Sequence, residues 1–347
     1  MKNLLVTDLH LDLIRANQYR WDIFSFLRKM ITKHSVDTLY ILGDLTEKSN
    51  KHDAVLVNRI IDELLKLLKH CVIYLLVGNH DYFDRSSPFF EFISKFEVHN
   101  DYDEHNFICF VNEPKLEEDL KGLFIPHGYF SHDLLLKEKS IRYVYMHEDI
   151  KGFKYESGKD TNGLDLSELR DKLIIFNGHI HRPQRKEDVI CIGSPYPIRF
   201  NDLGGIKGSE NLVYILDELE GTISFFHTNI MNRRKIVLSP YDFKDGFIDL
   251  EKFIGDDERN QFKFELKLLR GETYKYPEYV SIIKRICKAN DIEYCGCQCN
   301  ILKEETKNKK KKIRKQEESF EDILKRYVEK ENLSEKQLEL ALILMEE

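Results

Sequence analysis

Five short apolar segments, each followed directly by polar side chains, constrain the fold of this chain more than any other feature. They cover residues 4–6, 39–42, 73–77, 143–146 and 173–176. A nearly continuous apolar run of this length is typical of a strand that is covered on both faces, as in the parallel sheets of α/β proteins. The sequence therefore predicts an α/β fold with a buried sheet.

Amphipathic helices are predicted between the first three segments. Apolar residues share one helical face over 23–31, and leucine or isoleucine recurs at every fourth position over 56–68. A strand–helix–strand crossover makes neighbouring strands parallel, so that successive strands end at the same edge of the sheet. We expect the polar residues that follow the strands to converge at that edge, where α/β proteins build their sites.

Seven of the polar residues that follow the apolar segments are of types that bind metals. Imidazoles, carboxylates and one amide oxygen together suit manganese, iron or zinc, and contain too much nitrogen for calcium. Seven ligands exceed the need of one ion, so the set predicts two ions about 3.5 to 4 Å apart that share a carboxylate and hydrolyse phosphate esters. The predicted ligands are Asp8, His10, Asp44, Asn79, His147, His179 and His181.

Other residues near these positions receive different interpretations. His80 cannot easily point the same way as its neighbour Asn79, so we expect it to protonate the departing oxygen, oriented by Asp81 or another carboxylate. His127 is the main competitor of His147 for the fourth motif position, but it lies between a proline and a glycine, which favour a turn, and is interpreted as a loop histidine. Any one of these short motifs is common in turns, but five in this order after five apolar segments are hard to obtain by chance.

Composition limits the kind of protein that contains this site. The chain has 347 residues, 42% of them hydrophobic, which suffices for one large domain or two. Its net charge of -7 neither suggests nor excludes a nucleic acid partner. Seven scattered cysteines fit reduced thiols, and no apolar run approaches the roughly 20 residues that span a membrane, so we expect a cytoplasmic protein.

The rest of the chain predicts additional elements. Ser87 and Pro88 are interpreted as the start of a helix whose phenylalanines belong to the core. Strands over 234–240, 261–269 and 291–302 with a helix over 277–290 predict a small α+β unit, in which Cys295, Cys297 and Cys299 belong to a strand and not to a zinc site.

The lysine-rich stretch 303–318 is predicted to be a solvated linker, and 319–347 two helices whose apolar faces need a surface to pack on. The predicted domains are therefore 1–233, 234–302, 303–318 and 319–347.

The ordered motifs D-x-H, G-D, G-N-H-D, H and G-H-x-H, over residues 1 to about 205, resemble those of the calcineurin-like metallophosphoesterases. The resemblance implies a four-layer αββα sandwich in which two sheets are flanked by helices. It also implies one ion on Asp8, His10, Asp44 and His181, a second ion on Asp44, Asn79, His147 and His179, and a catalytic role for His80.

A nearer resemblance is to the SbcD-type nuclease subunits of DNA double-strand-break repair, especially the short bacteriophage recombination endonuclease form. It rests on GNHD at 78–81, NGHIHRPQ at 177–184 and CIGSPYPIRFND at 191–202. The resemblance implies a manganese-dependent DNA exonuclease and endonuclease, with a DNA-contacting cap domain over 234–302. It also implies C-terminal helices that dock on an SbcC-like coiled-coil ATPase, and a homodimer within a heterotetramer.

Cellular relatives carry a histidine where this chain has Glu47, so one phosphate-facing imidazole is absent. Two alternatives to a nuclease stay open. One is a small-molecule or protein phosphoesterase of the same family, and the other is a catalytically silent scaffold.

Overall fold

The computed structural model describes residues 1–47, 52–84, 87–95, 99–100, 103–137, 140–167, 173–200, 211–243, 247–250 and 259–302. Residues 1–302 form one compact unit. The predicted linker and C-terminal helices, 303–318 and 319–347, lie outside the described residues, and the predicted division of the chain at residue 233 stays a prediction. None of the helices described here is long and apolar enough to cross a membrane.

The first sheet has seven strands and contains three of the predicted strands as parallel neighbours. β1, β2 and β3 lie side by side, β7 extends the parallel order, and β14 runs antiparallel to β1. The order β15-β14-β1-β2-β3-β7-β6 is made of β15 (Thr222–His227), β14 (Leu212–Asp217), β1 (Lys2–Val6), β2 (Thr38–Leu42), β3 (Val72–Leu76), β7 (Asp103–Val111) and β6 (His99–Asn100).

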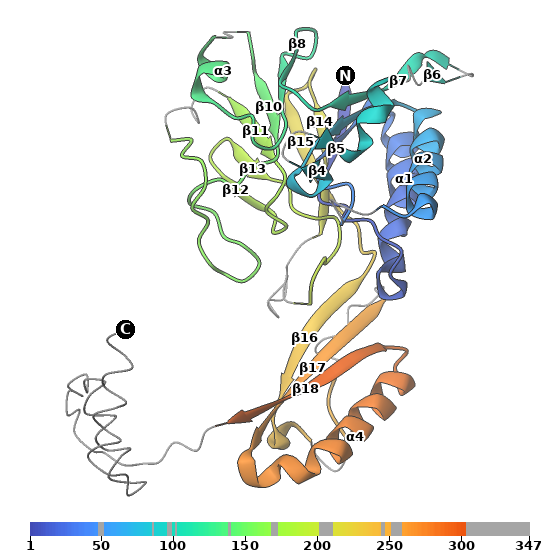
Figure 1. The fold of residues 1–347 in the computed structure, drawn as a ribbon, viewed down its shortest axis with the longest axis vertical. Coiled ribbons are helices and arrows are strands. Elements are labelled where there is room, and N and C mark those ends of the chain that lie inside the picture. Colours follow the sequence, from blue (N-terminus) through green and yellow to red (C-terminus); the bar gives the residue numbers. More distant parts are fainter. Residues whose placement is uncertain are drawn as a thin grey trace, which may run out of the picture. The chain divides into compact units, whose positions relative to one another are not determined.

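Two helices cover the outer face of this sheet, as the apolar periodicity predicts (Figure 1). α1 (Asp22–His34) ends at Ser35, which takes a left-handed conformation with φ 53°. α2 (Ala54–Leu68) begins after Asp53, whose carboxylate accepts a hydrogen bond from the Val55 amide and so caps the helix.

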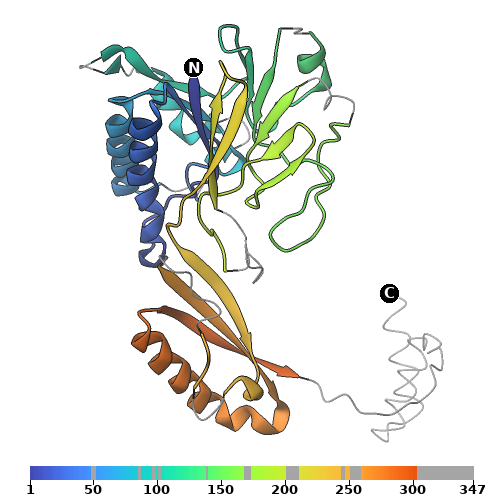
Figure 2. The same cartoon turned by 180° about the vertical axis from the view of Figure 1, so that it is seen from behind.

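The second sheet packs face to face on the first and contains the other two predicted strands, β10 and β11 (Figure 2). Aromatic rings fill the interface between the sheets, with Tyr40 and Tyr74 on one side meeting Phe124 and Tyr145 on the other. The strand order is β12 (Gln184–Lys186), β13 (Val189–Cys191), β11 (Ile174–Asn177), β10 (Tyr143–Met146), β9 (Gly122–Ile125) and β8 (Lys115–Glu117).

The outer face of the second sheet is covered by α3 (His132–Lys137) and by the loop that follows β10, from which Ile150, Phe153 and Leu166 pack on the strands. The mixed α/β sandwich predicted from the sequence is confirmed.

The segment at 87–95 differs from the α-helix that the sequence predicts. Ser87–Pro88 form a short strand, β5, paired with β4 (Tyr82–Asp84), and Phe89–Lys95 form a 3-10 helix, η3. Pro88 therefore sits in a strand pair instead of the first turn of an α-helix. The predicted core position holds, since Phe90 and Ile93 are buried.

The third sheet contains the strands and the helix predicted after residue 233. β16 (Asn232–Leu238), β17 (Asn260–Leu269) and β18 (Glu293–Leu302) are all parallel, and α4 (Tyr276–Ala289) covers one face. Alternate residues of β17 pack with α4, and the residues between them face away from the helix. Shorter 3-10 helices are η1 (Arg15–Trp21), η2 (Asn79–Asp81), η5 (Pro240–Asp242) and η7 (Arg270–Lys275).

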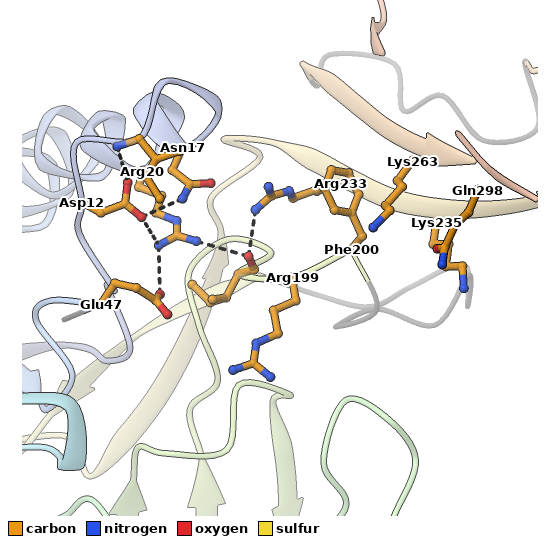
Figure 3. Close-up of a pocket in the computed structure, with 12 residues that line it drawn as sticks. Asp12, Asn17, Arg20, Glu47, Arg199, Phe200, Arg233, Lys235, Lys263 and Gln298 are labelled. Carbon is orange, nitrogen blue, oxygen red and sulfur yellow. Dashed lines mark hydrogen bonds and ion pairs between the residues drawn. The ribbon is translucent and has the colours of Figure 1, made fainter. Parts of the chain in front are cut away.

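A cavity of about 450 Å³ lies where the face of the third sheet that is turned away from α4 meets η1 and the loop at 198–200 (Figure 3). Two hydrogen bonds from β16 to the loop at 198–200 hold this junction together. Arg233 donates to the Ile198 carbonyl at 2.8 Å, and the Lys235 amide donates to the Phe200 carbonyl at 3.1 Å. The cations that line this cavity, here called the basic cavity, are Arg20, Arg199, Arg233, Lys235 and Lys263.

Candidate metal centre

The parallel strands bring all seven predicted ligands to one edge of the two sheets. Two follow β1, one follows β2, one lies in η2 after β3, one follows β10 and two follow β11. Because the first three strands belong to one sheet and the last two to the other, neither sheet alone could assemble the group.

The backbone at this edge is held in conformations that side chains rarely adopt. Asp8, His10, Asp44 and His179 have φ of 54°, 43°, 52° and 69°, which lie in the left-handed region. Each such residue costs of order 1 kcal/mol or more and persists only where the surrounding contacts impose it. Hydrogen bonds between the loops after β1 and β2 impose it here, since the His10 amide donates to the Asp44 carbonyl at 2.9 Å.

The glycines of the sequence motifs allow these loops to approach one another closely. A Cβ at Gly78 would lie 2.3 Å from the Asp44 amide nitrogen and Oδ1, and a Cβ at Gly178 would lie 2.6 Å from His147 Nδ1. Gly43 combines the same crowding with φ of 89°. The glycines of G-D, G-N-H-D and G-H-x-H are therefore required by packing around the ligands.

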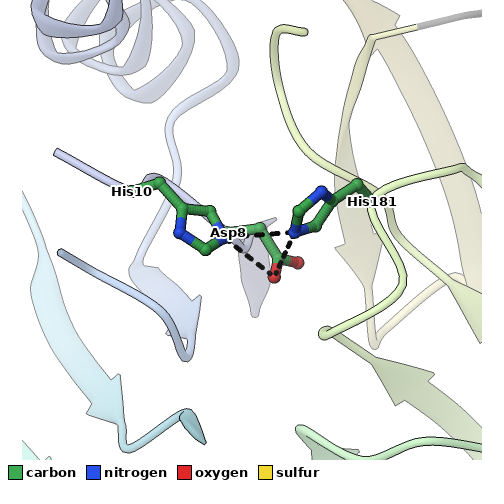
Figure 4. A group of neighbouring side chains, drawn as sticks. All are labelled: Asp8, His10 and His181. Atoms are coloured by element: carbon green, nitrogen blue, oxygen red, sulfur yellow. Dashed lines mark hydrogen bonds and ion pairs between the residues drawn. The ribbon is translucent and has the colours of Figure 1, made fainter. Parts of the chain in front are cut away.

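Asp8, His10 and His181 form the first group of possible ligands (Figure 4). Asp8 Oδ1 lies 3.8 Å from His10 Nε2 and 3.7 Å from His181 Nε2, and the two imidazole nitrogens are 3.1 Å apart. Asp8 is fully buried, and neither of its oxygens accepts a hydrogen bond from any residue that the structure describes. A buried carboxylate without donors is costly, whereas a cation between these three side chains would satisfy it.

Asp44 lies between this group and the next. Its Oδ2 is 3.5 Å from His10 Nε2, while its Oδ1 is 3.4 Å from His147 Nε2 and accepts the His80 amide at 2.8 Å. One carboxylate thus presents one oxygen to each group, as a bridging ligand would.

Asn79, His147 and His179 gather on the other side of Asp44. Asn79 Oδ1 lies 3.1 Å from His147 Nε2 and 2.8 Å from His179 Nδ1. His147 Nδ1 donates to the Leu42 carbonyl at 2.7 Å, which fixes the tautomer and turns the lone pair of Nε2 to the site. The donor set fits a second ion of the type predicted.

Charges within the group shift several pKa values. Burial alone would lower the pKa of His10 and His147, but the nearby carboxylates raise them to about 10 and about 9. Burial lowers the pKa of His181 to about 4, and Asp44 has a lowered pKa because His147 and His10 outweigh its burial. The metal-free site therefore holds protons that a divalent cation would displace.

His80 lies beside the first group but is oriented differently from the prediction. Its Nδ1 is 3.2 Å from the main-chain carbonyl of Glu47, and its ring lies 4.8 Å from that of His10. Asp81 instead accepts the amides of Gly78 at 2.9 Å and Leu45 at 3.0 Å. Asp81, the first of the carboxylates considered for orienting His80, has another role, because it ties the two loops together.

Two residues that the sequence analysis did not assign to the metal centre lie near it. His127 follows β9, the next parallel strand after β10, and its Nδ1 lies 3.0 Å from the His147 carbonyl and 3.3 Å from Glu148 Oε2. It obeys the same rule of a polar residue after a buried strand, which is why it competes with His147 in the sequence. Glu47 has no such signal, and its carboxylate lies 3.3 Å from His10 Nδ1.

Among the residues that the structure describes, the groups that could hold a metal are all at this edge, and none includes the three cysteines of β18. The sequence interpretation of those cysteines as strand residues agrees with their positions in β18.

Comparison with protein-family models shows the family of this chain. The model of the calcineurin-like phosphoesterase family matches residues 1–183, which is more than half of the chain. Putative phosphoesterase 244L of Invertebrate iridescent virus 6 is 27% identical over 161 residues, covering 44% of this chain and 55% of the relative. Exonuclease subunit 1 of Enterobacteria phage T4 is 23% identical over 213 residues, covering 56% and 58%.

The chain thus spans about half the length of the curated relatives that it matches. Among solved structures, the crystal structure of Pseudomonas putida nuclease MPE aligns with 61% of this chain and 83% of that one, at 14% identity and a TM-score of 0.31. The family match covers all the D-x-H, G-D, G-N-H-D, H and G-H-x-H motifs whose side chains converge at the sheet edge. This chain belongs to the calcineurin-like phosphoesterase family, whose members use divalent metals.

Proposed function

We propose that the chain is a metal-dependent nuclease that hydrolyses DNA phosphodiesters as a subunit of an SbcCD-like recombination and repair complex. The family match supports phosphoesterase chemistry. The name of the phage T4 relative, exonuclease subunit 1, supports a nuclease and a multi-subunit enzyme. The observation that carries the choice of a polymeric substrate is the basic cavity beside the metal centre.

The proposed ligands form two sets that share one carboxylate. Asp8, His10, Asp44 and His181 would hold one ion, and Asp44, Asn79, His147 and His179 the other. Two divalent ions, which we expect to be Mn²⁺, would neutralise the phosphate and make a water molecule nucleophilic near neutral pH.

His80 is the proposed general acid. Its Nδ1 faces the Glu47 carbonyl, which leaves the other ring nitrogen available to give a proton to the departing oxygen. Since its amide is held by Asp44 Oδ1 at 2.8 Å, the same carboxylate that would bridge the ions also fixes the position of this histidine.

The basic cavity is adjacent to this chemistry through Glu47, which lines the cavity and also contacts His10. Arg20 is balanced by Asp12 and Glu47, each 3.3 Å away, and Lys235 is paired with Glu265. Lys263 has no ion-pair partner among the described side chains.

Lys235 and Lys263 are directly opposite each other on β16 and β17. Glu265 pairs with Lys235, so among the described side chains Lys263 is the lysine whose charge stays open to an anion in the cavity. A small monoester needs one phosphate site, which the metal centre would provide. A second anion site a short distance away is instead suited to a chain of phosphates, for which cation contacts supply much of the affinity.

The experiment compares labelled linear DNA with bis(p-nitrophenyl) phosphate, both in Mn²⁺, with Asp44→Ala as the inactive control. The paired variant Lys235→Gln with Lys263→Gln should lower kcat/KM for DNA about tenfold or more and reduce its salt dependence, with a smaller loss on the small diester. Lys267→Gln is the matched control, since it replaces an exposed lysine of β17 that does not line the cavity.

Preferential hydrolysis of phosphate monoesters, with no cleavage of DNA, would support the small-molecule phosphoesterase instead. An absence of any hydrolysis in a protein that binds both ions would support the scaffold.

Docking of the C-terminal helices on an SbcC-like coiled-coil ATPase, and a homodimer within that complex, are part of the same proposal. They rest on the resemblance and on the apolar faces predicted over 319–347.

A further inference from the structure

Carboxylates stand behind two of the proposed metal ligands. Glu47 Oε2 lies 3.3 Å from His10 Nδ1, and Glu156 Oε1 lies 3.4 Å from His181 Nδ1. In both histidines the opposite nitrogen, Nε2, is the one that faces Asp8. Each imidazole is therefore set between a carboxylate outside the site and a carboxylate within it.

The second group, which consists of Asn79, His147 and His179, has no carboxylates behind its histidines in the described part of the chain. His147 Nδ1 donates to the Leu42 carbonyl, which is neutral. His179 turns its Nδ1 to Asn79 Oδ1 within the site, and no described carboxylate forms an ion pair with its ring. The two groups thus differ in the charge that lies behind their histidines, although they share Asp44.

Two contacts hold Glu47 beside His10. Its amide donates to the Leu11 carbonyl at 3.2 Å, and its carboxylate lies 3.3 Å from Nη1 of the buried Arg20. The Glu47 side chain is 30% exposed. Glu156 is also largely enclosed, with a side chain 16% exposed.

A carboxylate at ion-pair distance from Nδ1 makes the other nitrogen of an imidazole a stronger ligand and favours one orientation of the ring. Losing such a partner typically costs 10- to 100-fold in metal affinity. Because both histidines of one group have this support, its effect should fall almost entirely on one of two ions.

We propose that Glu47 and Glu156 are positioning residues that make the Asp8, His10 and His181 site the tighter of two ion sites, so that the sites fill in order. This inference rests on the two-ion centre of the proposed function. It also gives Glu47 a role of its own at the position where the cellular relatives carry a histidine.

The test is a Mn²⁺ titration of the full-length protein, in which free Mn²⁺ is followed by electron paramagnetic resonance. The wild type should bind in two resolved steps. Glu47→Gln and Glu156→Gln keep the size of the side chain, and each should weaken the tighter step by about 10- to 100-fold while leaving the weaker step in place. Circular dichroism and thermal unfolding establish that each variant is folded.

Two further variants assign the steps and control for charge. His147→Ala should remove the weaker step and retain the tighter one. Glu63→Gln is the matched control, since Glu63 pairs with Arg28 and Lys66 on α1 and α2 and contacts no proposed ligand.

The inference is overturned if Glu47→Gln and Glu156→Gln leave both steps unchanged, weaken both equally, or weaken only the step that His147→Ala removes. If these variants bind normally and DNA is still cleaved, the inference alone fails and the proposed function stands. If the wild type binds fewer than two ions, both fail. Two ordered steps without DNA cleavage would leave the inference intact and refute the nuclease.

Discussion

Gly78→Ala is the substitution whose effect follows most directly from the geometry of the site. The Gly78 backbone has φ of -96° and ψ of 179°, which any residue can adopt, so the backbone itself is not strained by alanine. The new methyl group would lie 2.3 Å from the Asp44 amide nitrogen and from Asp44 Oδ1, whereas an ordinary contact needs 3.4 Å or more. One of the two loops must therefore move by about 1 Å.

Neither loop can give way cheaply. One of the crowded atoms is backbone, and Asp44 Oδ1 already accepts the His80 amide and faces His147. Overpacking of this kind costs about 1–3 kcal/mol of unfolding free energy. A displacement of about 1 Å of the proposed bridging carboxylate should lower turnover about 100-fold or more.

The assay measures Mn²⁺ binding, hydrolysis of bis(p-nitrophenyl) phosphate and thermal unfolding on the same preparation. Gly271→Ala is the control, because a Cβ there meets nothing within 4 Å. A Gly78→Ala protein that binds Mn²⁺ and turns over like the wild type would refute the packing role given to this glycine.

Three more predictions concern His80 as the general acid, the protons on the metal-free His10 and His147, and the chain beyond Lys315. His80→Asn should keep Mn²⁺ binding and lower turnover by about 10²- to 10⁴-fold, so unchanged turnover on an unactivated leaving group would exclude His80 as the acid. Since the pKa of His10 is about 10 and that of His147 about 9 without metal, Mn²⁺ must displace their protons, and its affinity should rise from pH 6 to pH 8. Calorimetry in buffers of different ionisation enthalpy should detect the protons released, and a pH-independent affinity would contradict this assignment. Ending the chain at Lys315 should leave hydrolysis of a small diester and abolish copurification with a coiled-coil ATPase, whereas retained binding or unfolding would assign the tail to the core.

The sheet edge was predictable because the signal is local. A buried strand of four or five residues gives a continuous apolar run in the sequence. The ligands follow this run within a few positions, as Asp44 follows β2. Parallel pairing then forces separate strand ends together without any knowledge of side-chain contacts. The strands of the third sheet follow from the same local patterns, whereas the four-layer αββα arrangement was implied by the family resemblance.

The supporting contacts were not predictable, since they join residues far apart in the chain. Glu47 and Glu156 reach His10 and His181 from loops with no periodic pattern. His80 is oriented by a main-chain carbonyl, which leaves no trace in the identity of any residue. The net charge of -7 likewise hides the basic cavity, because its cations come from segments near residues 20, 199, 233 and 263.

The measurement that tests the central claim most directly is the number of Mn²⁺ ions bound per folded chain, by elemental analysis after equilibrium dialysis. The converging side chains predict about two ions in the wild type. Asp44→Ala should lose binding at both sites, since Asp44 Oδ1 and Oδ2 face different groups. A well-folded wild type that holds at most one weakly bound ion would contradict the dinuclear centre.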